Sequence, residues 1–258
     1  MNMPSEAAVA DVYSQCGLNI EKKLPEDKII ALAGNPNVGK STVFNSLTGL
    51  RQHTGNWPGK TVANAQGGCR YKGRNFIIVD IPGTYSLMAN SAEEEIARNF
   101  ICFGEPGVTV VVADATCLER NLMDEAKKKK IHIDLDRLSQ RLGIPVVGAS
   151  ARSGEGLDAL MDAAGRVTAG TALPLNPVRV TYGNEIEQAV SILEPAVEDV
   201  LHGRINSRWT ALRLLDNDWS LLASLKEYLH YDIMKDKKTA IRLLEARNFL
   251  KNQDISEN

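Results

Sequence analysis

A glycine-rich motif at residues 34–41, with the sequence GNPNVGKS, constrains the fold of this chain more than any other feature. It matches the pattern G-x-x-x-x-G-K-[ST], follows an apolar run at Lys28–Ala33 and precedes a helical pattern at Ser41–Thr48. In that strand–loop–helix setting, the backbone N–H groups of the loop and the helix N-terminus can surround phosphate oxygens. The sequence therefore predicts a phosphate-binding loop made of Gly34, Asn35, Pro36, Asn37, Val38, Gly39, Lys40 and Ser41.

Several side chains in and after this loop suit a nucleoside triphosphate with Mg²⁺. The ammonium group of Lys40 can reach the β- and γ-phosphates, and the hydroxyl of Ser41 can ligate Mg²⁺. Asp80, which ends another apolar run, can hold the same Mg²⁺ through water, and Gly83 can offer its N–H to the γ-phosphate. Thr61 can complete the Mg²⁺ coordination when a γ-phosphate is present. We expect nucleotide contacts from all of Asp80, Ile81, Pro82 and Gly83.

Two short motifs later in the chain predict which base is bound. The segment Asn121–Asp124 fits N-x-x-D, and its aspartate can accept hydrogen bonds from guanine N1–H and the 2-amino group, a donor pair that adenine lacks. The segment Ser150–Arg152 follows an apolar run, and its backbone can donate to guanine O6. Each motif alone is weak, but their order after the phosphate loop favours GTP and GDP. The expected base contacts are Asn121, Leu122, Met123, Asp124, Ser150, Ala151 and Arg152.

Apolar runs alternate with helical patterns through the first part of the chain. After Lys28–Ala33, the runs typical of buried strands are Phe76–Val79, Val108–Ala113 and Ile144–Ala149. The further helical patterns are Ala92–Phe103, Asp134–Leu142 and Leu157–Ala164. This alternation predicts an α/β fold, a P-loop GTPase (Ras-like) unit whose mostly parallel sheet has helices on both faces. We assign this G domain to residues 28–170, after an N-terminal extension at residues 1–27.

The pattern changes after residue 170. Apolar residues spaced by three and four positions between Ile186 and Leu201 mark one face of a helix. Ser207, Ser220 and Asp236 are good N-cap residue types near which further helices are expected to begin. The sequence therefore predicts a smaller all-α domain at residues 171–258, and we find no catalytic arrangement of residues in it.

Composition and charge exclude several other classes of protein. The chain has 258 residues and a net charge of −2, which disfavours electrostatic binding to nucleic acid. It has no apolar run of about 18 residues and no signal peptide, so we expect this sequence to be soluble and not to span a membrane. Its 4 cysteines are scattered, which favours reduced thiols over a disulfide or metal site.

Three stretches of the sequence resemble the cytosolic N-terminal part of the FeoB family, the bacterial ferrous iron transport protein B. They are Gly34–Gly49, Gly55–Val62 and Asp80–Leu87. The piece Gly55-Asn56-Trp57-Pro58-Gly59, just before Thr61, is the most specific of them. The helical C-terminal part fits as well, because that family carries a helical domain that tightens GDP binding, like a GDP-dissociation inhibitor. The resemblance covers about residues 28–258.

The resemblance implies a slow GTPase that potassium stimulates. In similar proteins the asparagine matching Asn37 binds K⁺ where an arginine finger acts in other GTPases, and carbonyl groups matching Gly55 and Trp57 help to hold it. The residues agree, because Thr84 and Tyr85 follow Gly83 in place of a water-positioning glutamine. The resemblance assigns catalysis to Lys40, Asn37, Thr61 and Gly83. It adds nucleotide contacts at Gly59, Lys60, Thr61, Val62 and Ala63.

The same resemblance implies a cellular role. The GTP state of this cytosolic part would regulate or drive Fe(II) uptake through a membrane domain that this chain does not contain. The expected partners are that membrane domain and small Feo accessory proteins, with no nucleic acid; a homo-oligomer is left open. The expected location in the full protein is the cytoplasmic side of the bacterial inner membrane.

Two other functions are compatible with the motifs. An RNA- or ribosome-associated assembly GTPase shares the phosphate loop and often depends on potassium, but it usually carries a basic RNA-binding appendage. A nucleotide-sensing module with negligible turnover would have the same binding motifs without the enzymatic activity.

One interval is shorter than the predicted fold requires. Asp114 ends an apolar run, and Asn121 follows only seven positions later. A crossover and another strand before N-x-x-D would take on the order of 20 residues. Either this chain lacks a segment here or the base site is remodelled, and we favour the first.

Overall fold

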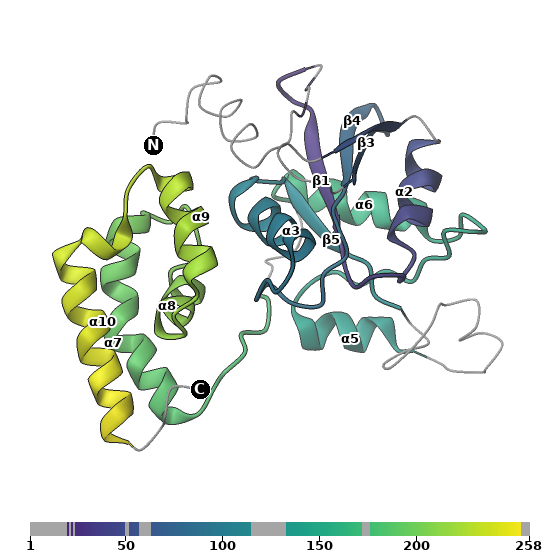
Figure 1. The fold of residues 1–258 in the computed structure, drawn as a ribbon. Coiled ribbons are helices and arrows are strands. Elements are labelled where there is room, and N and C mark those ends of the chain that lie inside the picture. The colour runs from purple at the N-terminus through teal and green to yellow at the C-terminus, as the bar shows by residue number, and fades with distance from the viewer. Residues whose placement is uncertain are drawn as a thin grey trace. The chain divides into compact units, whose positions relative to one another are not determined.

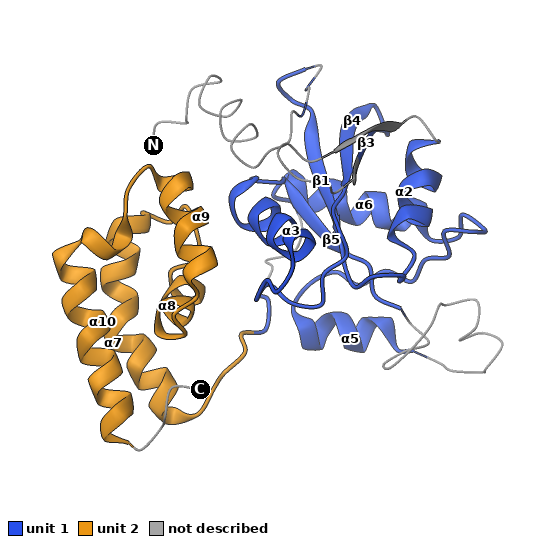
Figure 2. Ribbon diagram, viewed as in Figure 1, with its two compact units in different colours: residues 1–178 blue, residues 179–258 orange. Residues whose placement is uncertain are grey.

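The fold was analysed in a computed structural model (Figure 1), which describes residues 20, 22, 24–49, 52–56, 63–114, 133–171 and 176–253. For residues 52–56, 63 and 64 it describes the backbone alone. The chain divides into two compact units, residues 1–178 and residues 179–258 (Figure 2). Within the described residues, the helices are too short or too polar to cross a membrane.

The first unit contains a five-stranded sheet with the order β2-β3-β4-β1-β5. The strands are β1 (Lys28–Ala33), β2 (Gln52–Asn56), β3 (Ala63–Tyr71), β4 (Arg74–Asp80) and β5 (Val108–Val111). Strand β1 pairs in parallel with β4 and β5, whereas β3 pairs antiparallel with β2 and β4. The sheet is therefore mixed. A tight turn joins β3 to β4, and Lys72 and Gly73 adopt positive φ angles of 46° and 78° there, as hairpin turns require.

Helices cover both faces of this sheet, as the sequence predicted. They are α2 (Lys40–Thr48), α3 (Ala92–Phe103) and α6 (Leu157–Thr168), and a further helix of this unit is α5 (Leu135–Leu142). Side chains alternate along β1, so Ile29 packs with Phe100 of α3 on one face, and Leu32 packs with Phe44 of α2 and Met161 of α6 on the other. The carboxyl end of β1, where the phosphate loop begins, is thus held between two packed layers.

The predicted strand at residues 144–149 is wrong. This segment has no regular secondary structure, and only an isolated bridge joins the following Ser150 to Glu155. The cause lies at the edge of the sheet, because among the described residues β5 pairs with β1 and with no second strand. Val111 is accordingly 68% exposed, and α5 has no buried residue. An apolar run becomes a strand only where a neighbouring strand completes its hydrogen bonds.

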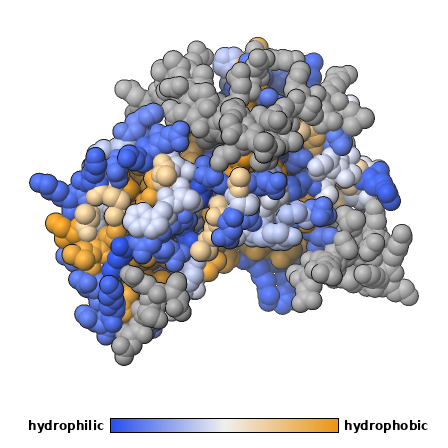
Figure 3. Space-filling model, viewed as in Figure 1, coloured by the Kyte–Doolittle hydropathy of each residue, from blue (hydrophilic) through white to orange (hydrophobic). Residues whose placement is uncertain are grey.

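The second unit is helical, as predicted. It contains α7 (Asn184–Leu201), α8 (Ser207–Leu215), α9 (Trp219–Leu229), the short 3₁₀ helix η1 (Ile233–Lys235) and α10 (Lys237–Asn252). The side chains of Asn206, Asp218 and Asp236 cap α8, α9 and α10. Figure 3 shows hydrophobic residues scattered among hydrophilic ones on the viewed surface, and the large apolar side chains exposed on α10 are Ile241 and Leu244.

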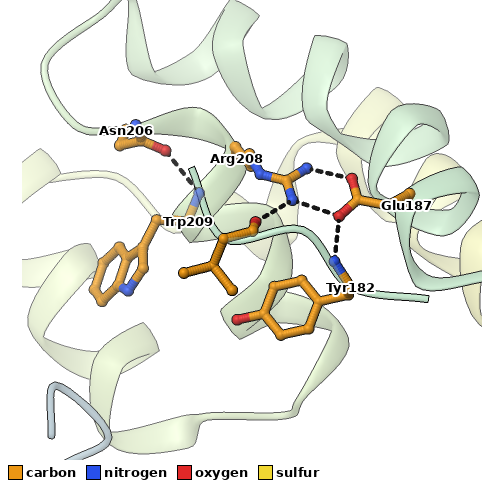
Figure 4. Close-up of polar contacts among 6 residues, drawn as sticks. Tyr182, Glu187, Asn206, Arg208 and Trp209 are labelled. Atoms are coloured by element: carbon orange, nitrogen blue, oxygen red, sulfur yellow. Dashed lines mark hydrogen bonds and ion pairs between the residues drawn. The ribbon is translucent and has the colours of Figure 1, made fainter. Parts of the chain in front are cut away.

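An ion pair fixes the entry of the chain into this helical unit (Figure 4). The guanidinium of Arg208, on α8, donates to both carboxylate oxygens of Glu187, on α7, at 2.8 and 2.7 Å, and to the carbonyl of Val180 at 3.2 Å. The same carboxylate accepts from the backbone N–H of Tyr182 at 2.8 Å. Hydrogen bonds from Arg208 and then from this N–H lower the pKa of Glu187.

The Arg208→Ala substitution should lower the midpoint of thermal unfolding at neutral pH. Because the pKa of Glu187 is lower in the folded state, the pair stabilises the fold above the unfolded-state pKa and loses that effect as pH falls through the folded-state pKa. The difference from the wild type should therefore shrink in acid. Arg242→Ala, which removes a more exposed pair with Glu245, is the control and should change the midpoint less. An equal effect of the two variants would contradict this role of Arg208.

Candidate nucleotide site

The phosphate loop turns sharply between β1 and α2, and its backbone requires particular residues. Gly34 has a φ of 140°, and a Cβ there would lie 2.2 Å from the carbonyl oxygen of Val112, so only glycine fits. Asn37 has a φ of 63°, a left-handed conformation that asparagine tolerates better than most residues. Gly39 precedes α2 with a φ of 93°. These conformations let the loop curl so that the amide groups at the start of α2 remain available to an anion.

The Lys40 side chain lies at the centre of the loop. Its Nζ donates to the carbonyl oxygens of Gly34 and Asn35, both at 3.1 Å. Lys40 is only 8% exposed; burial lowers its pKa, and the nearby Asp80 carboxylate opposes this shift. The loop is therefore wrapped around an ammonium group that attracts anions.

Ser41 and Asp80, which the sequence analysis assigned to the same Mg²⁺, are in contact. The Ser41 hydroxyl donates to Oδ2 of Asp80 at 2.9 Å, although the two residues are 39 positions apart. The other oxygen, Oδ1, is buried and has no hydrogen-bond partner among the described residues. Burial raises the pKa of Asp80, whereas the Ser41 hydroxyl and the Lys40 charge act in the opposite direction. A hydroxyl beside an unsatisfied carboxylate oxygen is a donor set that fits Mg²⁺.

The loop after β4 packs directly on the phosphate loop. A Cβ at Gly83 would lie 2.9 Å from the ring and backbone of Pro36, so glycine is needed for this contact. The backbone N–H of Thr84 donates to the carbonyl of Gly34 at 3.2 Å. Gly83 and the phosphate loop are thus adjacent.

The predicted base loop is a compact turn before α6. Within it, the backbone N–H of Ser150 donates to the carbonyl of Glu155 at 2.8 Å. Gly156 has a φ of 80°, and a Cβ there would lie 2.1 Å from the carbonyl oxygen of Gly148. The carbonyl of Ala151 accepts a hydrogen bond from the Ser46 hydroxyl of α2 at 2.8 Å.

Some predicted site residues lie outside the described part of the chain. These residues are Trp57, Gly59, Lys60, Thr61, Val62, Asn121, Leu122, Met123 and Asp124. Gly55 and Ala63 are described only by their backbone, in β2 and β3, where Gly55 pairs with Asn64 and Ala63 with Asn56. The geometry therefore brings together the phosphate loop, Asp80–Gly83 and, through Ser46, the loop 150–152.

Sequence reasoning missed several residues that organise the site. Glu94 accepts from the backbone N–H groups of Tyr85 at 3.3 Å and Asn90 at 3.0 Å, which anchors the loop after Gly83. The spacing of Ser91 and Glu94 fits a capping box, so a sequence signal for a helix start was present. By contrast, no sequence pattern indicates the contact of Ser46 with Ala151.

Comparison with protein families gave matches to both units. The model of "Ferrous iron transport protein B" matches residues 28–123 and 120–164, and that of the "FeoB cytosolic helical domain" matches residues 182–256. The first model thus matches in two segments that overlap at residues 120–123. This overlap lies at the end of the interval between Asp114 and Asn121 that is shorter than the predicted fold requires. The two models together span most of the described chain.

Relatives and solved structures agree with this result. The Fe(2+) transporter FeoB of Salmonella typhimurium is 36% identical over an alignment of 212 residues, which covers 73% of this chain and 27% of the relative. This chain thus spans about a quarter of the length of the curated relatives it matches. An S. thermophilus NFeoB mutant bound to GDP has a TM-score of 0.70 at 28% identity, covering 87% of this chain and 90% of that one. The T. maritima FeoB cytosolic domain in a GDP form has a TM-score of 0.65 at 31% identity, covering 88% and 96%.

The Asp80→Asn substitution should stabilise the nucleotide-free chain at neutral pH. Because burial raises the folded-state pKa of Asp80, its ionised form costs stability above that pKa, and the cost disappears as pH falls through it. An amide keeps an acceptor for Ser41 without the charge. We expect the unfolding midpoint to rise by a few degrees, as a change of roughly 1 kcal/mol gives in a chain of this length.

The gain from Asp80→Asn should shrink as the pH is lowered, and calorimetry between neutral and acidic pH measures it. Ser191→Ala, on the exposed side of α7, serves as a control that should show no pH-dependent difference. A variant that is less stable than the wild type at neutral pH would contradict the assignment of a buried, destabilising charge to Asp80.

Proposed function

Since this chain belongs to the FeoB family of ferrous iron transport proteins, we propose that its first unit binds and hydrolyses GTP. We further propose that this cycle regulates or drives Fe(II) uptake through a membrane domain of the full protein. The observation that carries the proposal is the convergence of Lys40, Ser41, Asp80 and Gly83 on one end of the sheet. Those are the groups that a triphosphate with a divalent cation requires.

The phosphate end of the site supports a distinct role for each residue. The amide groups at the start of α2 would hold phosphate oxygens, and the Lys40 ammonium, released from the carbonyls of Gly34 and Asn35, would contact the β- and γ-phosphates. Ser41 would ligate Mg²⁺, with Asp80 holding it through water and Thr61 completing its shell. The ion, when bound, neutralises charge that develops on the phosphates. Gly83 would donate its N–H to the γ-phosphate from beside Pro36.

The base end would select guanine. We assign base recognition to Asp124, helped by Asn121, and to the backbone of Ser150–Arg152. The compact turn of residues 150–156 supports this assignment, because a loop held by its own hydrogen bonds can present amide groups in a fixed direction. The GDP-bound structures among the similar proteins favour the same ligand class.

Potassium would complete the catalytic site. Asn37 would supply its side-chain oxygen to K⁺, and the carbonyls of Gly55 and Trp57 would supply others. The left-handed backbone of Asn37 supports this role, since this residue does not take the helical conformation that begins at Lys40 in α2. With Thr84 and Tyr85 following Gly83, no glutamine there positions the attacking water, so we propose slow turnover that depends on Lys40, Asn37, Thr61 and Gly83.

The membrane domain of the full protein would be the main partner. This chain would contact it from the cytoplasmic side of the bacterial inner membrane. The curated relatives are named Fe(2+) transporters, and one from Porphyromonas gingivalis is named a fusion of Fe(2+) transport protein A with FeoB. That name supports a small Feo protein as a second partner. The helical unit would tighten GDP binding, and assembly into a homo-oligomer stays a proposal.

GTP hydrolysis by the purified chain in KCl and in NaCl tests the function. We expect release of phosphate that is faster in KCl, and the Asn37→Ala variant should lose this stimulation while still binding GDP. Lys40→Ala should reduce turnover by roughly 100-fold or more, because it removes a charge that stabilises the transition state. Arg242→Ala, far from the site in sequence and on α10, is the control with wild-type turnover.

Hydrolysis that is equal in both salts would contradict the potassium mechanism but not the GTPase. An absence of turnover with tight GDP binding would replace the enzyme by a nucleotide-sensing module. Salt-dependent binding of RNA would favour an assembly GTPase instead.

A further inference from the structure

The two ends of the proposed site are carried by one helix, α2. Its first residues, Lys40 and Ser41, belong to the phosphate end. Ser46 lies on the same helix, and its hydroxyl donates to the carbonyl of Ala151 in the base loop at 2.8 Å. At 1.5 Å of rise per residue, Ser41 and Ser46 are separated by about 8 Å along the helix axis. A rigid helix thus spans the interval between the phosphate-binding and base-binding parts of the site.

No β-ladder among the described residues supports the segment that leads into the base loop. In a sheet that continued beyond β5, ladder hydrogen bonds would fix residues 144–149 and with them the loop that follows. Those residues form no ladder, and Ile144 is 39% exposed. The local turn, in which the N–H of Gly154 donates to the carbonyl of Ser150 at 2.9 Å, sets the shape of the loop but not its distance from the phosphates.

A hydrogen bond and apolar packing tie the base loop to α2. The hydrogen bond comes from Ser46. The packing arises because Ala151 lies against the core cluster that contains Val43 and Phe44 of α2. Apolar packing is non-directional and tolerates sliding, whereas a hydrogen bond to a carbonyl oxygen has a preferred direction as well as a distance.

We propose that Ser46 is a positioning residue that sets guanine recognition by holding the loop 150–152 at a fixed distance from the phosphate loop. The proposal rests on the proposed function, in that it assumes a guanine nucleotide in this site. Ser46 itself would contact no ligand. It acts through the backbone of Ala151, whose carbonyl accepts its hydrogen bond, and it would thereby set the position of this loop relative to the base.

Removal of the hydroxyl should weaken binding of the base and spare binding of the phosphates. In the full chain with Mg²⁺, we expect Ser46→Ala to raise the Kd of GDP by about two- to ten-fold, the range for one neutral hydrogen bond. The Kd of inorganic pyrophosphate, which uses only the phosphate end, should not change. Ser46→Thr, which keeps a hydroxyl at this exposed helical position, should restore GDP binding.

Controls separate positioning from stability. Ser191→Ala removes an exposed helical hydroxyl of α7 and should leave both Kd values at the wild-type level. Ser46→Ala should also keep the wild-type midpoint of thermal unfolding, since Ser46 is exposed and lies outside the core.

The ratio of the two Kd values decides the outcome. If Ser46→Ala keeps the wild-type ratio of GDP affinity to pyrophosphate affinity, the positioning role is overturned and the proposed function stays intact. This holds whether both affinities are unchanged or both fall. A wild-type chain that binds pyrophosphate but not GDP overturns the proposed function and this inference together.

Discussion

The buried ammonium group of Lys40 is the interaction on which the site depends. Lys40 is only 8% exposed, so its charge requires compensation, and the carbonyls of Gly34 and Asn35 provide it. These carbonyls point inward because the backbone of Gly34 takes a conformation that no side chain would permit against Val112. The loop amides are consequently left for another partner. The Lys40 ammonium is held by neutral carbonyls, and the negative charge of a phosphate group would neutralise it.

The rest of the first unit brings a second charged group to this centre. Strand β4 pairs in parallel with β1, and the register places Asp80 beside Leu32, just before the phosphate loop. Ser41 then reaches Asp80 from α2. The packing of α2, α3 and α6 on the two faces of β1 holds these segments in place, so the fold of the sheet determines the geometry of the site.

Local patterns in the sequence predicted much of this arrangement. Apolar periodicity predicted the bounds of β1 and α3. For α3, the residues after the cap Ser91 added a second signal. Both signals are local. The absence of a strand at 144–149 could not be predicted in this way, since an extended run needs a neighbouring strand and that neighbour depends on the whole sheet. The bond between Ser46 and Ala151 joins residues 105 positions apart, so it depends on tertiary packing that no local pattern encodes. The short interval after Asp114 was visible in the sequence, and it follows β5, which is the edge strand of the sheet among the described residues.

Amide hydrogen exchange tests most directly the central claim, that one nucleotide joins the phosphate loop to the base loop. It would be measured on the full chain with Mg²⁺ alone, with inorganic pyrophosphate and with GDP. Pyrophosphate should slow exchange at residues 37–41 only, whereas GDP should slow exchange there and at residues 150–152. Exchange at residues 150–152 that GDP leaves unchanged would contradict the central claim.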